Sequence, residues 1–125
     1  MKIAMTGIHV NDPIAAFKFY TDVLGFKEFL FMPEHKMAIV VSPDQPNGTA
    51  LLLEPGEKPI AKNYMQGLFQ SGLPAIVLGV IDVEKEFERL TGLGVKFKKQ
   101  PTKTDWGIEA IFDDSCGNYI QIHQS

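Results

Sequence analysis

Apolar and polar residues alternate with two different periods along this chain, and the changes of period mark its elements. A period of two, typical of a strand, runs from Ile3 to Val10. A helical period follows and ends at Gly25. Between them, Asn11-Asp12-Pro13 combines an N-cap residue with a proline in the first turn, which predicts a helix start. The predicted buried stripe of this helix consists of Ile14, Phe17, Tyr20, Val23 and Leu24.

Three further strands are predicted after this helix. Residues 26–32 and 36–42 would form a hairpin, and residues 49–54 would form the next strand. The turn-forming cluster Pro43 to Gly48 separates the last two. The first half of the chain is therefore predicted to have the order βαβββ.

The second half of the sequence repeats the first. Residues 8–12 align with residues 78–82, and Leu24-Gly25 aligns with Leu93-Gly94 after the loss of one residue. Such a repeat indicates two copies of one structural unit. The predicted elements of the second copy are a strand over 75–80, a helix capped by Asp82 with the stripe Val83, Phe87 and Leu90, and strands over 95–99, 106–112 and 118–123.

The length of the chain suggests how the copies are organised. At 125 residues it matches one ordinary domain, whereas a module of about 60 residues would be marginally stable alone. We therefore expect a single domain over 1–125, with module 1 at about 1–54, a linker at 55–72 and module 2 at about 73–125. We interpret the linker as carrying a short helical piece that covers a cavity.

Composition narrows the possible functions. The chain is 45% hydrophobic and 22% charged with a net charge of −3, which is typical of a soluble globular protein and offers no basic face for nucleic acid. Its apolar runs are too short to span a membrane, so no membrane partner is expected. The single cysteine, Cys116, excludes an internal disulfide and favours a cytoplasmic location. The slight acidity of the whole chain would suit a cationic guest.

Two motifs give the chain a family resemblance. The segment 19–26, following Val10-Asn11-Asp12, resembles the opening module of the vicinal oxygen chelate superfamily, and 112–121 resembles the end of its second module. That superfamily contains glyoxalases, extradiol dioxygenases, fosfomycin-resistance enzymes and bleomycin-binding proteins. The resemblance covers the whole chain and implies a glyoxalase-like α+β fold: two tandem βαβββ modules forming a cupped mixed β-sheet, with the helices outside. It specifies function weakly, because one fold supports several chemistries.

The resemblance also implies where a metal would bind. Enzymes of the family take one ligand from the first strand and one from the last strand of each module, usually His or Glu. The corresponding positions here are Met5, Leu52, Ala75 and Gln121. Only Gln121 offers a suitable oxygen, whereas a divalent cation needs several donors. We therefore expect no metal and no other cofactor.

Other side chains are predicted to face the cavity. His9 and Glu54 are the candidates for acid–base catalysis. His9 lies four residues from Met5, about 13 Å along a strand, which would place it at the mouth of the cup. The simpler interpretation of His9 is a partly exposed histidine with a hydrogen bond at a strand end, and that of Glu54 is a solvated carboxylate at a strand end. The predicted ligand-binding residues are His9, Glu54, Gln121, Tyr119 and Trp106, the last on a strand where it would close over a flat ligand.

Two kinds of function fit these residues. The first is a binding protein without chemistry, which resemblance to the bleomycin-binding branch implies to be a homodimer holding a small apolar or aromatic molecule. Apolar strand residues such as Phe29 and Met37 favour it. The second is a lyase, isomerase or dioxygenase that uses a displaced metal site at His9, Glu54, Gln121 and His123, or metal-free catalysis by His9 or Glu54.

Overall fold

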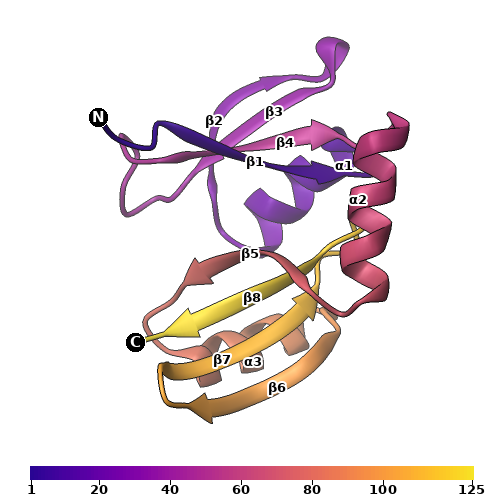
Figure 1. Cartoon of the computed structure of the whole chain (residues 1–125). Helices are drawn as coiled ribbons and strands as arrows, with labels where there is room; N and C mark the ends of the chain where they lie inside the picture. Colours follow the sequence, from indigo (N-terminus) through magenta and orange to yellow (C-terminus); the bar gives the residue numbers. More distant parts are fainter. The chain divides into compact units, whose positions relative to one another are not determined.

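The computed structural model describes all residues from Met1 to Ser125, and they form two compact units. Unit 1 is Met1–Met65 and unit 2 is Gln66–Ser125. Each contains a four-stranded mixed sheet, and the two sheets have equivalent strand orders (Figure 1). The predicted α+β class with two βαβββ repeats is confirmed. That the two units share one domain stays a prediction.

Unit 1 contains a sheet with the strand order β1-β4-β3-β2, in which β1 and β4 are parallel and the other neighbours are antiparallel. A helix and a π-helical segment follow β1, and a short 3-10 turn joins β2 to β3. The elements are β1 (Met5–Val10), α1 (Pro13–Lys18), η1 (Phe19–Val23), β2 (Lys27–Met32), η2 (Pro33–His35), β3 (Met37–Val41) and β4 (Ala50–Pro55).

Helix α1 begins as the sequence predicts. Asp12 Oδ1 accepts a hydrogen bond of 3.0 Å from the Ile14 backbone N–H, and Pro13 occupies the first turn. The predicted burial of Ile14 is wrong, because this side chain is exposed. The buried residues of the helix are instead Pro13 and Ala16. Ile14 directly follows Pro13, so it points about 100° away from the buried side.

Helix α1 and segment η1 cover one face of the unit 1 sheet. Phe17 stacks on Phe31 of β2 with ring centroids 4.0 Å apart. Tyr20 is fully buried, as are Val10 and Leu53 on the sheet. This apolar layer is the main core of unit 1.

Helix α2 (Pro59–Gln70) leads from unit 1 into unit 2. With 12 residues it is the longest helix in the chain, so the prediction of only a short helical piece here is wrong. Its buried Met65 packs against Gly56, where an added Cβ would overlap the Met65 sulfur. No helix in the structure combines the length and apolar character needed to cross a membrane.

Unit 2 contains a sheet with the order β5-β8-β7-β6, covered on one face by helix α3. Asp82 caps this helix as predicted, by accepting a 3.1 Å hydrogen bond from the Lys85 N–H. Phe87 packs edge-on against Phe97, and Phe112 is fully buried below them. The elements are β5 (Pro74–Gly79), α3 (Val83–Gly92), β6 (Phe97–Thr104), β7 (Gly107–Asp113) and β8 (Tyr119–Gln124).

Two local structures hold the strand ends of unit 2. In the β7–β8 turn, the fully buried Asp114 carboxylate accepts hydrogen bonds from the backbone N–H groups of Cys116, at 2.7 Å, and Asn118, at 3.0 Å. At the end of β8, Gln124 Oε1 accepts a 2.9 Å bond from the Val83 N–H at the start of α3. The Gln124 backbone oxygen also lies against Gly107, where φ is 134° and a Cβ would not fit.

Candidate functional site

The side of each sheet opposite its covering helix is called here the second face. In unit 1 it is partly buried: Ile39, Val41 and Ala50 form a small apolar cluster, with Leu30 and Leu52 packed against it. In unit 1, strand register aligns three rows of residues on β1 and β4: Met5 with Ala50, Gly7 with Leu52, and His9 with Glu54. Strands β3 and β2 extend these rows with apolar side chains. The second face of unit 1 comprises Met5, Gly7, His9, Leu30, Met32, Met37, Ile39, Val41, Ala50, Leu52 and Glu54.

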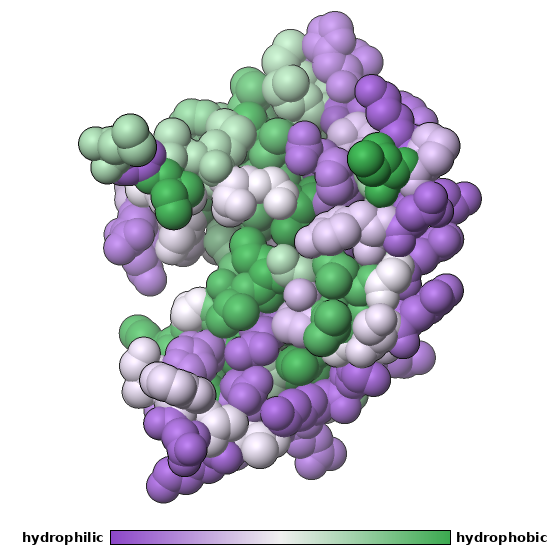
Figure 2. Space-filling model, viewed as in Figure 1, coloured by the Kyte–Doolittle hydropathy of each residue, from purple (hydrophilic) through white to green (hydrophobic).

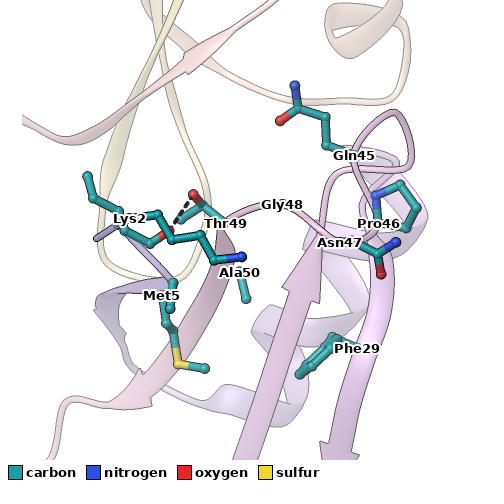
Figure 3. A pocket seen from close by; sticks show the side chains of 11 residues that line it. Lys2, Met5, Phe29, Gln45, Pro46, Asn47, Gly48, Thr49 and Ala50 are labelled. Carbon is teal, nitrogen blue, oxygen red and sulfur yellow. Dashed lines mark hydrogen bonds between the residues drawn. The ribbon is translucent and has the colours of Figure 1, made fainter.

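A cavity of about 680 Å³ lies where β1 and β4 begin (Figure 3). Its wall is formed by residues 2–5, by Phe29 of β2 and by the loop and strand residues 45–50. The volume lies within the range of about 300–1,000 Å³ that is typical of small-molecule sites. All of these residues belong to unit 1.

Three hydrogen bonds fix the loop that forms part of this wall. The Thr49 hydroxyl donates to the Ile3 carbonyl at 2.9 Å, the dashed line in Figure 3, and the Ala50 N–H donates to the Ala4 carbonyl at 3.1 Å. Within the loop, the Gly48 N–H donates to the Gln45 carbonyl at 2.9 Å. The cavity wall is therefore held to the start of β1.

Large apolar side chains are left accessible around the cavity. Met5 is 44% exposed and Phe29 is 59% exposed. Figure 2 shows apolar surface gathered over the sheet of unit 1, near the N-terminus. Accessible apolar surface in a concave site is what a small apolar ligand requires.

His9 and Glu54 come together at the opposite end of the same two strands. His9 Nε2 lies 3.9 Å from Glu54 Oε2, which is too long for a hydrogen bond but close enough for an ion pair when the imidazole is protonated. Gly7 makes room for the carboxylate, because a Cβ there would lie 2.8 Å from Glu54 Oε2. Both side chains are more than one third exposed, so the pair is accessible to solvent.

The cavity and this pair are separate features of the second face. None of the predicted ligand-binding residues lines the cavity, whereas Met5, one of the positions matched to a family metal ligand, does. The row of Gly7 and Leu52 lies between the two features. Sequence reasoning predicted that His9 and Glu54 share a face, and their register confirms this.

The remaining predicted ligand-binding residues lie in unit 2. Tyr119 stacks on Phe69 with centroids 4.2 Å apart, and Lys98 Nζ lies 5.2 Å from the Tyr119 ring centroid. The tyrosine ring is thus already engaged by neighbours within the unit. The strand position predicted for Trp106 is wrong: it lies in the β6–β7 turn with its side chain 85% exposed, since β7 begins at Gly107. A role in ligand binding for either residue stays a prediction.

Gln121 and His123 lie on the second face of unit 2. Gln121 is in register with Val77 of β5 and Ile111 of β7, and His123 is in register with Gly79 and Glu109. These neighbours make this face more mixed in polarity than its counterpart in unit 1. A role for Gln121 in binding stays a prediction.

The four positions that the resemblance assigns to metal ligands do not suit a divalent cation. Met5, Leu52, Ala75 and Gln121 offer one thioether and one amide, and hard or borderline cations need several oxygen or nitrogen donors. No group of three or more His, Cys, Asp or Glu side chains is arranged to hold a metal ion. That these are the family's ligand positions stays a prediction.

Sequence reasoning missed the cavity loop, because it treated residues 43–48 only as a turn. It named Phe29 as one of several apolar strand residues without placing it. The available signal was the unbroken apolar run 29–32, which departs from a strand's alternation. The structure has an irregular register between Glu28 and Leu30, and Phe29 lies at this bulge.

Comparisons with known proteins agree with this fold. The family model described as "Glyoxalase/Bleomycin resistance protein/Dioxygenase superfamily" matches residues 2–122. The uncharacterized protein YurT of Bacillus subtilis strain 168 is 49% identical over 126 residues, covering 99% of each chain.

Two solved structures are also similar. UcmS2 is 26% identical with a TM-score of 0.83, and the match covers 100% of this chain and 98% of that one. TnmS3, an antibiotic binding protein from Streptomyces sp. CB03234, is 26% identical with a TM-score of 0.75, covering 99% and 95%. The chain therefore belongs to the glyoxalase/bleomycin resistance protein/dioxygenase superfamily.

Proposed function

We propose that this protein binds a small, largely apolar or aromatic molecule in the cavity of unit 1 and does not transform it. The observation that carries the proposal is the 680 Å³ cavity with accessible Met5 and Phe29 in its wall. Covering such surface with a ligand contributes about 25 cal/mol for each Å² of apolar area removed from water.

The comparisons support the same class of function. TnmS3 is described as an antibiotic binding protein, and the family description includes bleomycin resistance. At 26% identity this likeness supports binding of a small molecule but does not identify the molecule.

The proposal is tested with the neutral fluorescent probe phenylnaphthylamine, whose emission rises in an apolar site. The protein should bind it, and Phe29→Ala should weaken binding by about tenfold, because a buried aromatic contact is lost. Tyr64→Ala is the matched control, since Tyr64 is an aromatic of unit 1 with 60% exposure that lies outside the cavity. No binding, or equal losses in the two variants, would refute the proposal.

A second candidate function rests on the 3.9 Å approach of His9 to Glu54. In this alternative, one of the two groups removes a proton next to a carbonyl of a bound substrate, and the other stabilises the protonated partner. The test is the exchange of the α-hydrogens of acetophenone in heavy water, followed by NMR. Exchange that exceeds background and falls about 100-fold in His9→Gln would favour catalysis. Background exchange in the wild type would rule out this reaction.

The homodimer implied by the family resemblance is also a proposal. Sedimentation equilibrium measures the assembly directly. A monomer at micromolar concentration would contradict it.

A further inference from the structure

The wall of the unit 1 cavity carries a positive charge, whereas the chain as a whole is negative. The chain has a net charge of −3, but the only charged side chain in the cavity wall is that of Lys2. The acidic residues Glu28 and Asp44 precede the wall residues Phe29 and Gln45 in sequence, and neither of them lines the cavity. In Figure 3 the Lys2 side chain extends toward the β4 side of the cavity.

The uncharged polar groups of the wall are compatible with an anion. Gln45 and Asn47 have side-chain amides, which can each donate two hydrogen bonds, and both come from the loop fixed to the start of β1. Phe29 and Met5 add an aromatic ring and a polarizable thioether. The cavity lining thus contains one cation, two side chains with N–H donors, and two large apolar side chains.

We infer that the cavity selects planar aromatic molecules that carry one negative charge, such as a carboxylate or sulfonate, over neutral or cationic molecules of the same size. The inference rests on the proposed function, because it specifies the ligand of the same cavity. The net charge of the chain favours a cationic ligand, and the inference predicts an anionic one instead. Apolar contact provides most of the affinity, and Lys2 provides the preference for an anion.

The size of the preference follows from the exposure of the lysine. Lys2 is exposed, so water and salt weaken its attraction for an anion. An exposed ion pair changes affinity by about fivefold at low salt. The preference is therefore expected to be modest and sensitive to ionic strength.

Two dyes with the same ring system test the inference. Anilinonaphthalene sulfonate carries a negative charge, and phenylnaphthylamine is neutral. The wild-type protein should bind the sulfonate about fivefold more tightly, and Lys2→Met should bring the ratio of the two dye affinities close to one. Lys2→Arg should retain the preference. Raising salt from about 0.02 to about 0.5 M should weaken only sulfonate binding.

Lys62→Met is the matched control, because it removes an exposed positive charge of unit 1 that lies outside the cavity. Equal affinities for the two dyes, or the same effect from Lys62→Met as from Lys2→Met, would overturn the inference and leave the proposed function intact. If neither dye binds, or if Phe29→Ala changes neither affinity, the proposed function itself fails. Circular dichroism confirms that each variant is folded.

Discussion

The two units have equivalent sheets, but they differ on the face that no helix covers. On the covered face, the repeat-related residues Leu53 and Ile122 are both buried. On the second face, Leu52 corresponds to Gln121, and Glu54 corresponds to His123. At these positions the repeat has kept apolar side chains on the covered face and changed the side chains of the second face.

The turns that precede the last strands differ in the same way. Asp114 of unit 2 is fully buried and holds its turn with its carboxylate. The corresponding residue of unit 1 is Gln45, which lines the cavity and contributes its backbone carbonyl to the turn. One position of the repeat thus stabilises a turn in unit 2 and forms part of a cavity wall in unit 1.

The largest expected effect on stability concerns the helix-covered faces of the two sheets. Leu53→Ala and Ile122→Ala should each lower the free energy of unfolding by about 2–5 kcal/mol, because each leaves a cavity in a buried layer. On the second faces, Leu52→Ala should lower the free energy of unfolding by less than Leu53→Ala does. Likewise, Gln121→Ala should lower it by less than Ile122→Ala does. Chemical denaturation measures all four. Equal losses on the two faces of one unit would contradict the comparison.

The next effect distinguishes the two turns. Asp114→Ala should lower the free energy of unfolding by about 2–3 kcal/mol, because it removes a charged acceptor and leaves buried N–H groups without their partner. Gln45→Ala should change it by less than about 0.5 kcal/mol, as is usual for an accessible side chain. Thermal and chemical denaturation of both variants check this. A comparable loss in Gln45→Ala would mean that the two turns are stabilised alike.

A smaller effect concerns Gly7, whose counterpart in unit 2 is Val77. Gly7→Ala should displace the Glu54 carboxylate, because the new Cβ would lie 2.8 Å from Oε2. Stability should change by only about 0.5 kcal/mol, since the carboxylate ends a flexible side chain and alanine is favoured over glycine in a strand. A crystal structure of the variant gives the result. A His9–Glu54 distance that stays at 3.9 Å would show that Gly7 is not needed for the pair.

The smallest effect concerns the exposed ion pair at the β2–β3 hairpin of unit 1. A hydrogen bond of 2.6 Å to Glu57 raises the pKa of Lys36 above its ordinary value of 10.5. A raised lysine pKa adds stability below the unfolded-state pKa, and this is lost as pH rises through the folded-state pKa. Glu57→Gln should return the Lys36 pKa toward 10.5, measured by NMR titration. An unchanged pKa would exclude Glu57 as the cause.

Much of the fold could be predicted because local signals and long-range packing agree. Asp12 and Asp82 cap helices where the sequence places them. Strand β6 was predicted less well: residues 95–99 were expected, and Phe97–Thr104 is observed. Its second part is polar and contains Pro101, which an edge strand tolerates but which hides the usual alternation.

The candidate site was less predictable than the fold. The His9–Glu54 pair could be predicted, because the alternation of apolar and polar residues along each strand shows which side chains share a face. The cavity depends instead on the bulge at Phe29 and on the backbone hydrogen bonds of the loop that contains Gln45. These features arise from irregular backbone, and no repeating pattern of apolar residues encodes them.

The end of strand β8 has a practical consequence for any shortened or fused form of this protein. Gln124 holds the first turn of α3 through Val83 and lies against Gly107 in the neighbouring hairpin turn. Ending the chain at His123 would therefore release a helix terminus and a hairpin turn together, although it removes residues that look dispensable in the sequence. An affinity tag or a fused protein should therefore leave Gln124 in place.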